Sequence, residues 1–116
     1  MPEARNGDSL TIAQISDIHC GGVDFVPNLL ERAIREINDL APDIVICSGD
    51  LTTFGFKHEY VLAKSYLDQI ECESVVVIPG NHDSRNVGYV HFEDMFGERN
   101  SVLRVPGLTV VAVDST

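Results

Sequence analysis

Residues 43–50 read DIVICSGD, a run of apolar strand formers that ends in a glycine and a carboxylate. Runs that are apolar almost throughout are typical of parallel strands covered on both faces. Pro42 precedes the run, and Gly49-Asp50 follows it at once. The stretch therefore predicts a buried strand whose carboxyl end releases Asp50 into a loop.

Strands and helices alternate on either side of this run. Further strands are predicted over residues 10–16 and 74–78, which are rich in β-formers and also end in polar loops. Apolar residues recur at helical spacing over residues 27–40 and from about 57 to 70. Strands separated by helices run parallel, and their crossovers are right-handed.

The first of these helices carries clear start and stop signals. Pro27 suits its first turn, Asp24 is a plausible cap just upstream, and Pro42 ends it. Its apolar residues predict one buried face, made of Leu29, Leu30, Ala33, Ile34, Ile37 and Leu40.

The last third of the chain predicts shorter elements. Residues 90–96 are expected to form one short helix, residues 101–105 an edge strand and residues 108–113 a buried strand. The fold class is therefore α/β, with a mostly parallel sheet and flanking helices.

Three polar clusters follow the three main strands: Asp17-Ile18-His19, Gly49-Asp50 and Gly80-Asn81-His82-Asp83. Ligands gather outside the carboxyl ends of parallel strands, so these clusters are expected to converge. Carboxylates, imidazoles and a carboxamide are ligands for a borderline-hard divalent cation. Each cluster alone is a weak signal, and Asn-His-Asp is also typical of a self-capping loop.

The spacing suggests a role for each side chain. Asp17 and His19, two apart on extended chain, point the same way and would hold one cation, while Asp50 would bridge two. Asn81 offers a neutral oxygen. Beside the Asp83 carboxylate, His82 would be an oriented general acid that protonates a leaving alkoxide. Two cations would generate hydroxide for attack on phosphorus, so the clusters predict hydrolysis of a phosphate ester.

Composition restricts the remaining possibilities. The 116 residues are enough for one domain, and residues 1–9 are polar, which predicts a flexible lead without a secretory signal. No apolar run approaches the length of a membrane span. A formal net charge of −10 argues against a broad grip on nucleic acid. Three cysteines without a CxxC pair point to a reducing cytoplasm, with Cys20 near enough to touch the site.

Together, the three clusters resemble the calcineurin-like metallophosphoesterase superfamily, whose pattern begins Asp-x-His, Gly-Asp and Gly-Asn-His-Asp/Glu. The resemblance covers residues 10–116, and the stretches around Asp50 and residues 79–85 are similar to the class III cyclic-nucleotide phosphodiesterase branch. It implies Asp17 and His19 on a first metal ion, with Asp50 bridging to a second ion.

The resemblance also implies the remaining roles. Asn81 would bind the second metal ion and approach the phosphate, and His82 would be the acid or a phosphate contact, oriented by Asp83. Arg85 would reach a substrate phosphate, with a solvated loop arginine as the alternative. The two ions would be manganese, iron or zinc, and the substrate a phosphate ester such as a cyclic nucleotide.

The family pattern continues with a separate His and a Gly-His-x-His that this sequence lacks. We expect His58 to be a surface or capping residue and His91 to be structural. Residues 10–116 are thus expected to be the N-terminal half of an α/β/β/α sandwich, truncated before the later ligands. The face left open would favour a homodimer or a complementing C-terminal half. The alternative to a phosphodiesterase or phosphatase is a non-catalytic metal-binding or partner-binding fragment.

Overall fold

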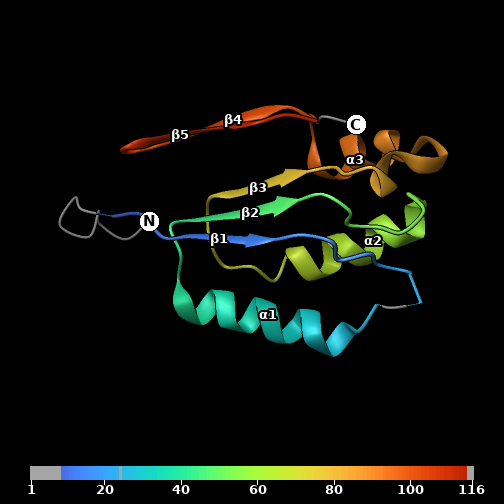
Figure 1. Ribbon diagram of the computed structural model, residues 1–116, viewed down its shortest axis with the longest axis horizontal. Coiled ribbons are helices and arrows are strands. Elements are labelled where there is room, and N and C mark those ends of the chain that lie inside the picture. The colour runs from blue at the N-terminus through green and yellow to red at the C-terminus, as the bar shows by residue number, and fades with distance from the viewer. Residues whose placement is uncertain (1–8, 24, 115–116) are drawn as a thin grey trace.

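The computed structural model describes residues 9–23 and 25–114 and has an α/β arrangement (Figure 1). The elements in chain order are β1 (Ile12–Ile15), α1 (Pro27–Leu40), β2 (Ile44–Ser48), α2 (Lys57–Leu67), β3 (Val75–Ile78), the 3-10 helix η2 (His82–Val87), α3 (Gly88–Phe96), β4 (Ser101–Val105) and β5 (Leu108–Ala112). Apart from Ser9, the predicted lead of residues 1–9 lies outside the described residues, and so does the Asp24 cap.

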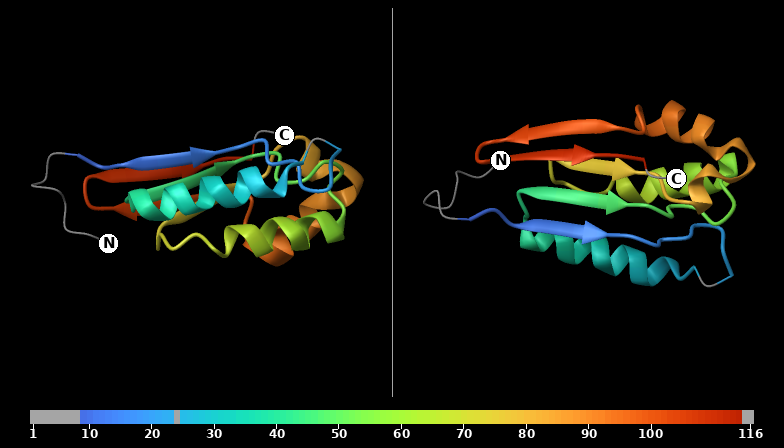
Figure 2. Two further views of the ribbon diagram at one scale, coloured as in Figure 1. Left: turned by 90° about the horizontal axis from the view of Figure 1, so that it is seen from below. Right: turned by 45° about the horizontal axis from the view of Figure 1, so that its top comes forward.

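The first three strands form a parallel sheet in the order β1-β2-β3. The register pairs Ile15 with Cys47 and Cys47 with Val77, so the strands end nearly level. Figure 2 shows α1 and α2 on the same face of this sheet, as successive right-handed crossovers require. The predicted α/β class with a mostly parallel sheet and flanking helices is confirmed.

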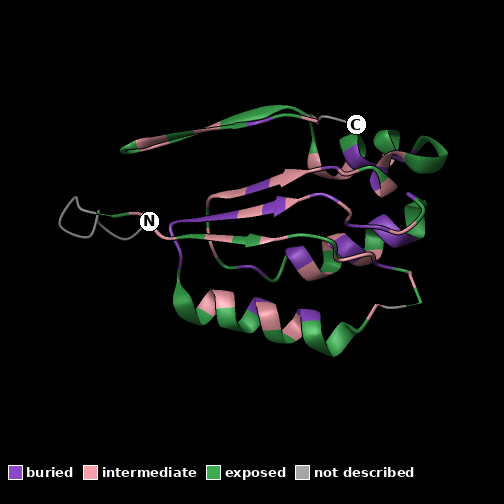
Figure 3. Ribbon diagram, viewed as in Figure 1, coloured by how far each residue is buried: buried purple, intermediate pink, exposed green. Residues whose placement is uncertain are grey.

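The core lies between the sheet and these two helices. Alternate strand residues face the helices, and Val45 and Cys47 of β2 are fully buried there (Figure 3). From the helices, Ile34, Tyr60 and Ala63 pack into the same core and are at most 2% exposed. The central strand is thus the most buried, as its apolar sequence predicts.

The hairpin β4–β5 departs from the prediction. It forms a separate antiparallel sheet and contacts the parallel sheet through β3 and β5. Exposure alternates along β5, and Val111 is 66% exposed, so the prediction of a buried strand at residues 108–113 is wrong. An apolar sequence buries a strand only where other layers cover both of its faces.

Helix α1 is also less buried than its pattern predicts. Leu30 and Ile34 are buried, but Leu29 is 64% and Leu40 59% exposed. The sheet beside α1 ends at β1, which is an edge strand in the described part of the chain. None of the described helices has the length and apolarity needed to cross a membrane.

Candidate metal centre

The parallel pairing of β1 and β2 continues beyond the strands into the loops. The amide of Asp17 donates to the carbonyl of Gly49 at 3.1 Å, and that of His19 donates to the carbonyl of Asp50 at 2.9 Å. The amide of Cys20 donates to the carbonyl of Leu51 at 2.9 Å. This ladder holds the loop after β1 beside the loop after β2, and it brings the first two polar clusters together.

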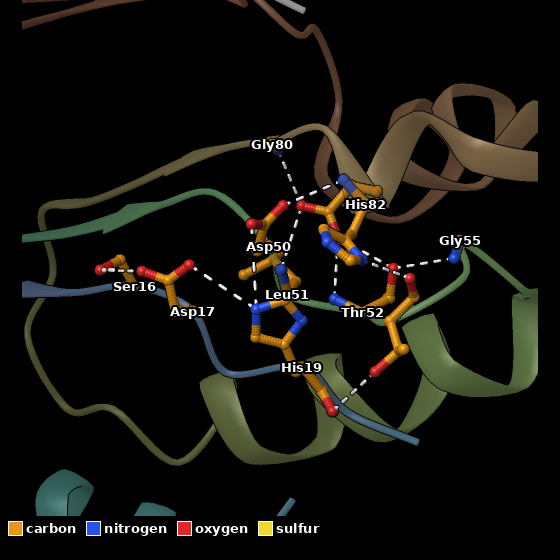
Figure 4. A network of polar contacts seen from close by, with 11 residues as sticks. Ser16, Asp17, His19, Asp50, Leu51, Thr52, Gly55, Gly80 and His82 are labelled. Atoms are coloured by element: carbon orange, nitrogen blue, oxygen red, sulfur yellow. Dashed lines mark hydrogen bonds and ion pairs between the residues drawn. The ribbon is translucent and has the colours of Figure 1, made fainter. Parts of the chain in front are cut away.

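Three side chains meet at this edge of the sheet: Asp17, His19 and Asp50 (Figure 4). Nε2 of His19 lies 3.6 Å from Oδ1 of Asp17 and 3.9 Å from Oδ2 of Asp50. One ligand atom from each residue lies within 4.8 Å of the others. Ligands about 2.0–2.2 Å from one ion lie roughly 3–4.4 Å apart, and both distances from His19 fall in this range. Two carboxylates and an imidazole at this position are therefore a candidate set of ligands for one divalent cation.

The backbone of all three residues is unusual. Asp17, His19 and Asp50 have φ angles of 58°, 52° and 52°, in the left-handed region that disfavours residues with a Cβ. Each such conformation costs on the order of 1–2 kcal/mol. Strain of this kind persists only where the surrounding structure holds it, and it is concentrated at functional sites.

His82 lies beside this cluster. Its backbone amide donates to Oδ1 of Asp50 at 3.0 Å, and its ring meets the His19 ring edge-on with centroids 4.8 Å apart. Nδ1 of the His82 ring lies 2.7 Å from the carbonyl oxygen of Thr53. Because a carbonyl oxygen only accepts hydrogen bonds, Nδ1 carries a proton, and Nε2 is the nitrogen left for other chemistry.

The expectation that Asp83 orients the His82 ring is wrong. The Asp83 carboxylate is fully buried and accepts hydrogen bonds from Leu51, Thr52 and Gly80. Burial raises the pKa of this carboxyl, while the donated hydrogen bonds act in the opposite direction. The Asp83 carboxylate therefore points into the protein, and the backbone carbonyl of Thr53 accepts the hydrogen bond from the His82 ring.

The other residues singled out in the sequence lie in three helices or at their ends. Asn81 is exposed at the N-terminal end of η2, and Arg85 is exposed within it. His58 is exposed and stacks on Phe56, whereas His91 is partly buried against Tyr60.

Cys20 is close in sequence to the cluster but fully buried. Burial raises the pKa of its thiol to about 12, with Glu59 and Asp83 acting in the same direction. The protonated thiol is a poor metal ligand, since the thiolate is the ligating form.

The part played by Thr53 is not visible in the sequence. Its contribution is a backbone carbonyl, which every residue possesses, so no side-chain pattern could have identified it. The only signal was its place in the loop directly after Asp50.

Comparisons with known proteins identify the family of this chain. The calcineurin-like phosphoesterase family model matches residues 10–114. A probable glycerophosphodiester phosphodiesterase of Arcobacter nitrofigilis is 32% identical over 92% of this chain and 44% of its own. A glycerophosphodiester phosphodiesterase of Enterobacter lignolyticus is 35% identical over 60% of this chain and 22% of its own.

A probable cyclic nucleotide phosphodiesterase of a Synechococcus strain is 28% identical over 99% of this chain and 48% of its own. The chain thus spans less than half the length of these curated relatives.

Proposed function

The chain belongs to the calcineurin-like phosphoesterase family, and on that premise we propose that it carries the N-terminal part of the active site of a metal-dependent phosphodiesterase. The observation that carries the proposal is the convergence of Asp17, His19 and Asp50 at the carboxyl edge of the sheet. Further ligands of a dinuclear centre would come from residues beyond these 116 or from another chain.

Asp17 and His19 would hold the first metal ion, and Asp50 would bridge to the second, which Asn81 would also bind. When bound, the ions would supply a Lewis acid and a water of lowered pKa. Asp50 suits the bridging role because its two oxygens face different neighbours. Oδ2 faces His19, and Oδ1 accepts one hydrogen bond from the described residues, which the His82 amide donates. Both oxygens thus retain lone pairs.

His82 would donate the proton that the leaving group needs. With Nδ1–H held on the Thr53 carbonyl at 2.7 Å, the protonated ring presents Nε2–H as its other donor. Transfer of that proton to the departing alkoxide leaves a neutral imidazole that is still fixed by the same carbonyl. General acid catalysis of this kind is typically worth about 10²–10⁴-fold in rate.

The substrate class we propose is a phosphodiester, because the relatives carry the names of glycerophosphodiester and cyclic nucleotide phosphodiesterases. Arg85, exposed three residues after His82, is the cation nearest in sequence for a non-bridging phosphate oxygen. The chain as a whole is acidic, so bound cations and this arginine would supply the local positive charge.

A second candidate is a metal-binding fragment without catalysis. The observation that favours it is that the described residues place three ionisable ligands around one position, which is enough to hold one ion. Both candidates require that the wild-type chain bind a divalent metal. They differ in whether the metal-bound chain hydrolyses a phosphodiester.

One experiment separates them. Binding of Mn²⁺ and Zn²⁺ would be measured by calorimetry for the wild type, Asp17→Asn and His82→Ala, together with hydrolysis of a cyclic nucleotide, whose leaving group is an alkoxide that needs a proton. We expect Asp17→Asn to lose binding, and His82→Ala to bind metal but lose at least about 10²-fold in rate. His58→Ala, an exposed histidine on α2, is the control and should match the wild type. Turnover that falls in His82→Ala favours the first candidate, metal binding without turnover favours the second for these 116 residues on their own, and a wild type that binds no metal contradicts both.

A further inference from the structure

One buried carboxylate joins the two loops that carry the candidate site. Oδ1 of Asp83 accepts from the amide and the hydroxyl of Thr52 at 2.8 and 2.9 Å. Oδ2 accepts from the amide of Leu51 at 3.0 Å and from that of Gly80 at 2.9 Å. Leu51 and Thr52 follow β2, whereas Gly80 follows β3. A single oxygen therefore receives one hydrogen bond from each loop.

These hydrogen bonds lie next to the functional side chains. Leu51 directly follows Asp50, whose left-handed φ of 52° needs support from its surroundings. Thr52 directly precedes Thr53, whose carbonyl holds the His82 ring. The amide of His82 also donates to Oδ1 of Asp50 at 3.0 Å, so the loops after β2 and β3 are hydrogen-bonded at the candidate site as well.

We propose that Asp83 is the positioning residue of this centre: its carboxylate locks the loop after β2 to the loop after β3 and so fixes Asp50 and His82 relative to each other. The proposal deepens the proposed function, because it takes Asp50 as a metal ligand and His82 as the acid. In this proposal Asp83 supports the backbone of the two loops, whereas the sequence predicted that it would contact the His82 ring. Groups that orient metal ligands typically change metal affinity 10–100-fold when they are mutated.

Glu59 provides a matched control. It is only 2% exposed, and its Oε1 accepts from the amides of Phe54 and Phe56 at 2.8 and 3.2 Å. These donors belong to the same loop after β2, but among the described hydrogen bonds none ties Glu59 to the loop after β3. Asp83→Asn and Glu59→Gln both keep the side-chain shape and replace one accepting oxygen by an amide group that only donates.

The test measures both variants of the full chain in two ways. Hydrogen exchange and the ¹⁵N signals of the His82 ring are recorded without metal, and Mn²⁺ affinity is measured by calorimetry. For Asp83→Asn we expect faster exchange at Leu51 and Gly80, loss of the single Nδ1–H tautomer of His82, and a 10–100-fold weaker metal affinity. For Glu59→Gln we expect faster exchange at Phe54 and Phe56 only, with the His82 tautomer unchanged and metal affinity within about threefold.

Two results would overturn the proposal. One is an Asp83→Asn protein in which His82 keeps the single Nδ1–H tautomer. The other is a Glu59→Gln protein that loses this tautomer as fully as Asp83→Asn does, because the tautomer would then depend on the overall stability of the protein and not on Asp83. If the wild type binds no Mn²⁺, the proposed function fails, but the ring signals still decide the role of Asp83. Should Asp83→Asn not fold, Thr52→Val removes one donor to the same carboxylate and must shift the His82 tautomer in the same direction.

Discussion

At the scale of single residues, two buried thiols make the free energy of unfolding depend on pH. Cys20 and Cys47 are fully buried, and burial raises the pKa of each thiol to about 12 from an ordinary 9.0. Below pH 9 both the folded and the unfolded chain keep these protons, whereas between pH 9 and 12 only the folded chain keeps them. The unfolded state thus binds fewer protons, and the free energy of unfolding falls as the pH rises.

Each thiol should lower the free energy of unfolding by about 1.4 kcal/mol per pH unit in that window. Urea denaturation at several pH values from 8 to 11 measures this slope. Cys47→Ala should have a lower free energy of unfolding at pH 8 than the wild type. Its free energy of unfolding should also fall less steeply with pH, because only one buried thiol remains. Val45→Ala, a truncation in the same buried strand, should keep the slope of the wild type. Equal slopes for the two variants would contradict the burial of the Cys47 thiol.

The sequence predicted which side chains would meet but not what holds them. Asp17, His19 and Asp50 could be identified because the carboxyl ends of parallel strands share one edge. The partner of His82 could not, since a carboxylate one residue away was the simplest choice, and the real acceptor is the carbonyl of Thr53. Which way Asp83 points depends on the path of two loops, and that path is decided by backbone hydrogen bonds.

At the scale of elements, the strands and the two long helices were predictable because their periodicity is strong. The strand predicted over residues 74–78 is β3 at Val75–Ile78, and the helix predicted over residues 27–40 is α1. Helix η2 was missed because its backbone changes direction at Arg85, with ψ of 151°, and its last residues have φ near 52°. Asparagine tolerates such a φ, but valine does not favour it, so the sequence does not predict this turn at Val87.

Gly88, which follows η2, lies against the backbone of Asp83 and of Gly55 in the loop after β2. A Cβ added to Gly88 would overlap the carbonyl oxygen of Asp83 and lie 2.9 Å from that of Gly55. Both obstacles are backbone atoms that cannot move aside as a flexible side chain would. We therefore expect Gly88→Ala to destabilise the protein by about 3 kcal/mol or more.

Chemical denaturation measures this change, with Gly107→Ala as its control. Gly107 lies in the turn of the β4–β5 hairpin, where an added Cβ meets nothing within 4 Å. Its φ of 88° still disfavours alanine, so the control should cost about 1–2 kcal/mol. Equal losses for the two variants would mean that Gly88 does not lie against Asp83.

At the scale of the whole molecule, the open edge of the sheet is the main feature. Next to the carboxyl end of the edge strand β1, Val26 and Leu29 at the start of α1 are 47% and 64% exposed. Phe25 and Leu29 line a groove that reaches Asp17 of the candidate metal centre. Adjacent apolar side chains of this kind are typical of surfaces that bind another protein segment.

We therefore expect the 116-residue chain, expressed alone, to associate with a second copy through this edge. Sedimentation velocity over a range of concentrations would detect a dimer that dissociates on dilution. Leu29→Gln should weaken the dimer roughly tenfold, because burying a leucine side chain is worth about 1.5–3 kcal/mol and this one is already partly buried.

Val61→Gln on α2 changes a residue that is 52% exposed and lies outside the groove, so it should leave the dimer intact. A complementing C-terminal half that binds the same edge would compete with the second copy, and adding it should dissociate the dimer. A well-folded monomer at the highest soluble concentration would contradict this prediction, because burial of these side chains would then not offset the cost of association.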